Sequence, residues 1–106
     1  MMLVSDDSNT LRLVAEENFS HTFAEALHIK LQETLRDVKS KNVILDMTQV
    51  ELVDSMGVKL LAGLYKACQE KKLGFSIEVA HPSVSKVLRL CKLDQLIEIR
   101  EVPGVE

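Results

Sequence analysis

Residues 43–57 read VILDMTQVELVDSMG and contain the most informative pattern of the chain. An apolar strand, Val43–Met47, runs into a short polar loop, and the loop leads to Ser55 in the first turn of a helix. A hydroxyl at that position can cap the helix, as Ser commonly does. A phosphate there would instead face unpaired backbone N–H groups and the positive end of the helix dipole. For Ser55 the residues alone leave both roles open, an ordinary cap and a phosphorylation site.

The helix after the loop is predicted from Ser55 to about Glu70. Its apolar positions recur at helical spacing, and they are Gly57, Leu60, Leu61, Leu64 and Cys68. Gly57 costs the helix roughly 0.5–1 kcal/mol relative to alanine. Two explanations are open for it, close packing of the helix on the sheet and room for a partner's surface near Ser55.

Alternating and periodic patterns on both sides predict the remaining elements. We expect strands at 2–4, 11–14, 75–79 and 96–100, a helix from Ser20 to about Val38, and a third helix that begins at 81–83. The resulting order is β-β-α-β-α-β-α-β. Its strand–helix–strand crossovers predict an α/β fold, a mixed and mostly parallel sheet covered by helices. The apolar residues 43–45 favour a central strand buried on both faces.

Composition limits the classes of function. With 106 residues the chain has the size of one domain, 1–106. A net charge of −3 gives no basic surface for nucleic acid. No run of about 18 apolar residues could span a membrane, and the N-terminus lacks the basic region of a secretory signal. Cys68 and Cys91 fall on predicted helix faces and are interpreted as buried apolar residues in a reducing compartment. We therefore expect a cytoplasmic protein.

Patterns typical of enzymes and metal sites are missing. A serine nucleophile on a strand–turn–helix elbow requires Gly-x-Ser-x-Gly, and Val53 stands where the first glycine belongs. His21 and His28 are seven residues apart, too far for the i, i+4 ligand pair of a helical zinc site. There is no glycine-rich phosphate loop. The prediction is a protein that is not an enzyme and that has no metal and no cofactor.

The tetrapeptide Asp54-Ser55-Met56-Gly57, with an apolar strand before it and an apolar helix after it, resembles the signature of the STAS family. That family groups anti-sigma factor antagonists with cytoplasmic domains of sulphate transporters, and the resemblance extends from Leu11 to Ile99. It implies a binding switch. The unphosphorylated domain binds a regulator that is often both an anti-sigma factor and a serine kinase. Phosphorylation of the serine matched by Ser55 breaks the complex, and a serine phosphatase restores it.

The resemblance and the expected sheet edge also suggest a partner surface. Lys59 lies one turn beyond Ser55 on the same helix face, where it is a solvated lysine or a partner for a phosphate. The third helix should begin at the same sheet edge, because both loops follow parallel strands, and Ser83 is its capping candidate. The residues assigned to partner binding are Ser20, Asp54, Met56, Gly57, Lys59, His81 and Ser83.

Two departures from the family pattern suggest a partner other than the usual sigma-control kinase. Met56 replaces the second serine of many antagonists and offers an adaptable apolar contact. Ser20 stands where many relatives carry an aspartate near the phosphorylation site. We expect a monomer when the protein is free. The alternative function is a constitutive structural subunit, such as the small STAS protein of an ABC lipid-transport complex, which needs no switch.

Overall fold

The computed structural model describes residues 2–6, 9–15, 29, 33 and 41–102. In these ranges the elements are β1 (Met2–Asp6), β2 (Thr10–Ala15), β3 (Asn42–Met47), α2 (Ser55–Glu70), β4 (Gly74–Val79), α3 (Pro82–Leu90), the 3-10 turn η1 (Leu93–Gln95) and β5 (Glu98–Glu101). Most of the helix predicted from Ser20 to about Val38 lies outside the described residues. The two described residues within it, Ile29 and Glu33, are helical.

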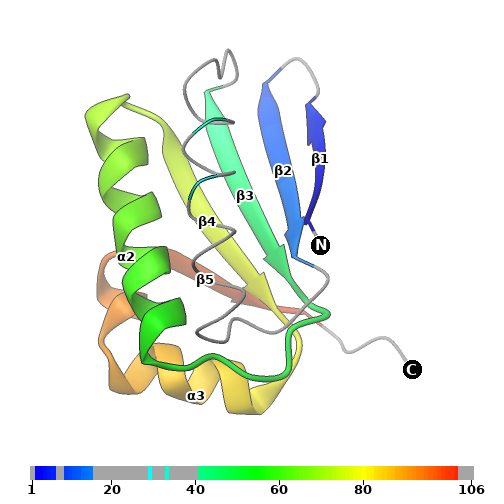
Figure 1. Cartoon of the computed structure of the whole chain (residues 1–106), viewed down its shortest axis with the longest axis vertical. Coiled ribbons are helices and arrows are strands. Elements are labelled where there is room, and N and C mark those ends of the chain that lie inside the picture. Colours follow the sequence, from blue (N-terminus) through cyan, green and yellow to red (C-terminus); the bar gives the residue numbers. More distant parts are fainter. Residues whose placement is uncertain (1, 7–8, 16–28, 30–32, 34–40, 103–106) are drawn as a thin grey trace.

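The five strands form one sheet in the order β1-β2-β3-β4-β5 (Figure 1). β1 pairs with β2 in antiparallel fashion. The pairs β2–β3, β3–β4 and β4–β5 are all parallel. The predicted α/β fold with a mixed, mostly parallel sheet is confirmed.

Strand order places α2 and α3 on the same face of the sheet (Figure 1). Each parallel crossover joins neighbouring strands in the same direction, and such connections are almost always right-handed, so successive helices lie on one side. Leu13, Leu45 and Ile77 are in register across β2, β3 and β4 and are fully buried beneath that layer. The helices complete the core with Leu60, Leu61, Leu64, Cys68, Val84 and Leu88.

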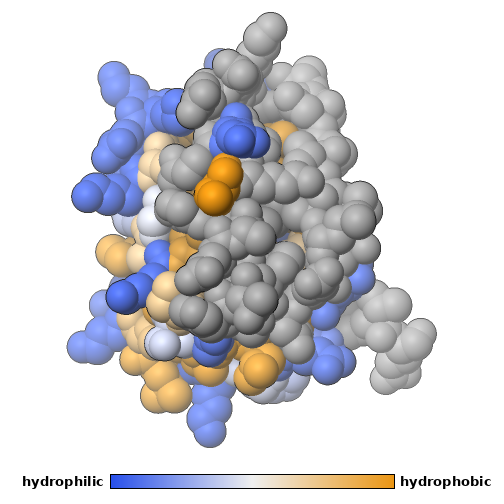
Figure 2. All heavy atoms as spheres, viewed as in Figure 1, coloured by the Kyte–Doolittle hydropathy of each residue, from blue (hydrophilic) through white to orange (hydrophobic). Residues whose placement is uncertain are grey.

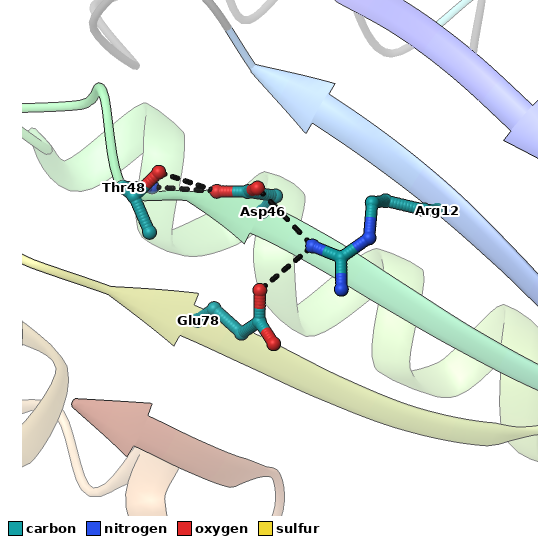
Figure 3. Close-up of polar contacts among 4 residues, drawn as sticks. All are labelled: Arg12, Asp46, Thr48 and Glu78. Carbon is teal, nitrogen blue, oxygen red and sulfur yellow. Dashed lines mark hydrogen bonds and ion pairs between the residues drawn. The ribbon is translucent and has the colours of Figure 1, made fainter. Parts of the chain in front are cut away.

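The other face of the sheet carries a cluster of charged side chains (Figure 3). Arg12 Nη1 donates to Asp46 Oδ2 at 3.1 Å and to Glu78 Oε1 at 2.8 Å, which links β2, β3 and β4. The hydrogen bond to Glu78 raises the pKa of Arg12, although burial acts against it. The expectation that β3 is buried on both faces is therefore wrong. Its alternate residues Val43, Leu45 and Met47 are buried, whereas Ile44 and Asp46 are half-buried.

The C-terminal part differs from the sequence prediction in two details. The chain forms η1 after α3, so the last strand begins at Glu98 and Leu96 remains exposed. Cys91 is exposed at the end of α3, which contradicts its predicted burial. Cys68 is buried as expected, and burial raises the pKa of its thiol to about 11.

Candidate functional site

The loop between β3 and α2 is held in place from its first residue. Asp46 Oδ1 accepts hydrogen bonds from Thr48 N at 3.0 Å and from Thr48 Oγ1 at 2.7 Å, which ends the strand in a local turn. Val50 N then donates to Met47 O at 3.0 Å. Val50 and Val53 are both buried in the core. The loop therefore follows a defined path to α2.

Asp54 is the N-cap of α2. Its backbone is extended, with φ −101° and ψ −175°, and its Oδ1 accepts a hydrogen bond from Gly57 N at 2.9 Å. Its carbonyl oxygen accepts from Val58 N at 3.0 Å and begins the helical ladder. The interpretation of Ser55 as the cap is therefore wrong, because the preceding carboxylate already satisfies the first turn.

Ser55 is the first residue of α2 and is exposed. Among the contacts made by described residues, its hydroxyl has no hydrogen-bond partner. The neighbouring Asp54 carboxylate is engaged by Gly57 N, and the side chain of His81 makes no cap hydrogen bond. Ser55 thus presents an accessible hydroxyl at the first residue of α2.

The next residues of α2 differ in how far they reach the surface. Met56 is half-buried and packs against the core. Gly57 is buried, which fits the close-packing explanation of this glycine. Lys59 is exposed on the turn after Ser55. Of these three residues, Lys59 and part of Met56 are available to a partner.

The start of α3 lies against the same loop, as the shared-edge argument predicted. His81 is the N-cap through its backbone alone, and Pro82 is the first helical residue. The predicted capping role of Ser83 is wrong. The Ser83 hydroxyl donates to Glu51 O at 2.8 Å and so joins α3 to the β3–α2 loop. Ser20, also assigned to partner binding, lies outside the described residues.

The sequence did not single out Leu52, which is 56% exposed in the middle of this loop. Its neighbours Val50 and Val53 are equally apolar, yet both are buried. Apolar character alone therefore gave no signal that one of the three faces solvent. Its position three residues before Ser55 places it in the candidate site.

The family model of the STAS domain matches residues 3–104. The chain belongs to the STAS domain family. Its fold is similar to that of a candidate anti-sigma factor antagonist from Thermotoga maritima, with a TM-score of 0.87, 17% identity, and coverage of 95% of this chain and 86% of that one. An anti-sigma factor antagonist from Mycobacterium paratuberculosis gives a TM-score of 0.82 at 23% identity, with 96% and 86% covered.

The anti-sigma factor antagonist SpoIIAA shares the fold in two states. The unphosphorylated form matches with a TM-score of 0.78 at 16% identity, covering 93% of this STAS domain and 87% of SpoIIAA. The phosphorylated form, from Bacillus, gives 0.70 at 15% identity, with 93% and 90% covered. At these identities the likeness establishes the fold.

The described residues of this STAS domain contain no group of three or more His, Cys, Asp or Glu side chains arranged to hold a metal ion. None of their helices is long and apolar enough to cross a membrane.

Proposed function

We propose that this STAS domain is a binding switch of the anti-sigma factor antagonist type, controlled by reversible phosphorylation of Ser55. When unphosphorylated it binds a regulator of the serine-kinase, anti-sigma type, and a serine phosphatase restores that state. It acts in the cytoplasm as a monomer when free, and it catalyses no reaction itself. One observation carries the proposal. Asp54 caps α2, so Ser55 is not needed as the cap and its hydroxyl is exposed.

The added charge explains how modification would break a complex. A phosphoryl group brings about −1.5 to −2 charges at pH 7. At an interface that excludes water, such a charge without a partner is costly. Ser55 is exposed in the unbound domain, so the charge remains hydrated there and opposes only the bound state.

The fold should tolerate the same charge. The helix N-terminus favours an anion by about 0.3–1 kcal/mol, and Lys59 on the next turn adds a modest, salt-screened attraction. The Asp54 carboxylate repels a phosphate on Ser55, and its hydrogen bond to Gly57 N keeps it at the adjacent position. These terms are of similar size, so the net effect on stability should be small.

The test is a binding comparison of Ser55→Ala and Ser55→Asp. Tagged variants capture partners in the native host, and the amount of one identified protein is quantified for each variant. Ser55→Ala removes a small hydroxyl and should retain that protein. Ser55→Asp should weaken binding at least about 100-fold, or about 2.7 kcal/mol.

The charge control is Gln69→Glu, which adds a negative charge to the same helix about 21 Å from Ser55, at 1.5 Å per residue. Gln69 is exposed, and this variant should bind like wild type. Phosphate-affinity gels of the wild-type chain should show a modified band that Ser55→Ala lacks. Equal capture by the Ala and Asp variants, together with no modified band under any growth condition, would refute the switch and favour a constitutive subunit.

A further inference from the structure

The β3–α2 loop presents a large apolar side chain to solvent beside the proposed switch. Leu52 is 56% exposed, whereas Val50 and Val53 on either side of it are 0% and 4% exposed. Figure 2 shows apolar surface in the lower part of the view, over the region where this loop and α3 lie in Figure 1. Single exposed apolar residues are common on protein surfaces, and Leu90 and Leu96 are at least as exposed as Leu52. Leu52 is a candidate for contact with a partner because it lies three residues before Ser55, in the loop that leads to α2.

The backbone around Leu52 is fixed before any partner arrives. On one side, Ser83 Oγ holds the carbonyl oxygen of Glu51 at 2.8 Å. On the other side, Val53 is buried and Asp54 is committed to capping α2. An anchor whose backbone is already ordered loses less conformational freedom on binding than one in a loose loop.

Leu52 and Ser55 are close enough to share one interface. Three residues span at most about 11 Å of extended chain. A standard protein interface covers about 800 Å² on each partner, so a partner centred on Leu52 would also cover Ser55. A charge on Ser55 would then fall inside the area that the partner must desolvate.

We propose that Leu52 is the apolar anchor of the switch surface, that it inserts into an apolar pocket of the regulator protein, and that Ser83 is its positioning residue. This inference rests on the proposed function. A protein fits the site better than a lipid surface does, for reasons of charge. Glu51 and Asp54 flank the leucine with carboxylates, and the chain carries a net charge of −3, so anionic headgroups would be repelled.

The test measures the affinity of the regulator protein that wild type retains and Ser55→Asp loses, purified and titrated by calorimetry. Leu52→Ala should weaken binding at least 10-fold, as expected for a central anchor. The matched control is Leu96→Ala, because Leu96 is 57% exposed and follows η1, beyond the opposite end of α3 from Ser83. It should change affinity less than 2-fold. Both variants should keep the wild-type Tm.

The positioning role has its own readout. Ser83→Ala should weaken binding of the regulator by less than Leu52→Ala does. Ser83→Thr keeps the hydroxyl and should therefore bind the regulator with nearly the wild-type affinity. Loss with both Ser83 variants would assign the effect to packing of α3 and overturn the positioning role.

Other outcomes separate the two proposals. If Ser55→Asp abolishes binding and Leu52→Ala binds like wild type, the anchor is refuted and the switch stands. If no captured protein responds to Ser55→Asp, the proposed function fails and the anchor falls with it. If Leu52→Ala leaves protein binding unchanged but reduces sedimentation with phosphatidylglycerol vesicles, Leu52 is a membrane contact and the inference is wrong.

Discussion

Replacing Asp54 by alanine should destabilise the domain, whereas replacing Ser55 by alanine should not. Loss of an Asp cap typically costs about 1 kcal/mol, within a range of 0.5–2. Here the bonded donor is the N–H of Gly57, a buried residue, and a buried donor left without an acceptor costs about 1–3 kcal/mol. We therefore expect Asp54→Ala to lower the free energy of unfolding by about 1–2 kcal/mol. Ser55→Ala, at an exposed position, should stay within about 0.5 kcal/mol.

The measurement is unfolding of each variant by heat and by urea, followed by circular dichroism. For a domain of this size, each kcal/mol lowers Tm by roughly 4–8 °C. The control is Asp54→Asn, since asparagine caps helices about as well as aspartate and should recover most of the loss. The dependence of the free energy of unfolding on urea concentration should be equal among the variants. Equal slopes would show that the variants differ in stability and not in the surface that unfolding exposes.

One result would refute the assignment of Asp54 as the cap and Ser55 as an independent surface residue. If Ser55→Ala destabilises the domain as much as Asp54→Ala, the serine hydroxyl carries the cap. Phosphorylation would then act on the fold itself rather than on a surface, and the separation of cap and switch would be lost.

Three further predictions concern a charge at Ser55, the two cysteines and the ion pairs of Arg12. Ser55→Asp should keep the cooperative thermal transition, with Tm within a few degrees of wild type, because a helix N-terminus accepts an anion; loss of that transition in a melting curve would contradict it. In a thiol titration at pH 8, the exposed Cys91 should react at once and the buried Cys68 only after unfolding. Burial raises the Cys68 pKa from 9.0 to about 11, so the unfolded chain releases this proton first and stability should fall as pH rises between those values, a slope that Cys68→Val should lack. Arg12→Met leaves the two facing carboxylates of β3 and β4 without their shared cation, and should cost about 1 kcal/mol at low salt but less at high salt, because salt screens partly exposed charges; an equal cost at both salt concentrations would exclude the charge explanation.

The sequence alone predicted most of the described elements and the place of the candidate site along the chain. Alternation in the segments that became β2 and β4, the apolar run that became β3, and the 3.6-residue period after Ser55 indicate which residues face a core. These patterns depend on neighbouring residues alone. The tetrapeptide Asp54-Ser55-Met56-Gly57 located the loop–helix junction, because capping residues and a helical apolar run follow one another in sequence. The structure confirms the helix at Ser55–Glu70.

Tertiary structure decided which of several equivalent residues takes each role. Asp54 and Ser55 can both cap a helix, and the one with an extended backbone became the N-cap. β3 is buried on one face because sequential strand order and right-handed crossovers place successive helices on the same side, a property of the whole sheet that no single strand encodes. Leu52 is exposed, whereas Val50 and Val53 are buried. The path of the loop, which packs against the core and is hydrogen-bonded to Ser83, determines which of these three side chains is buried.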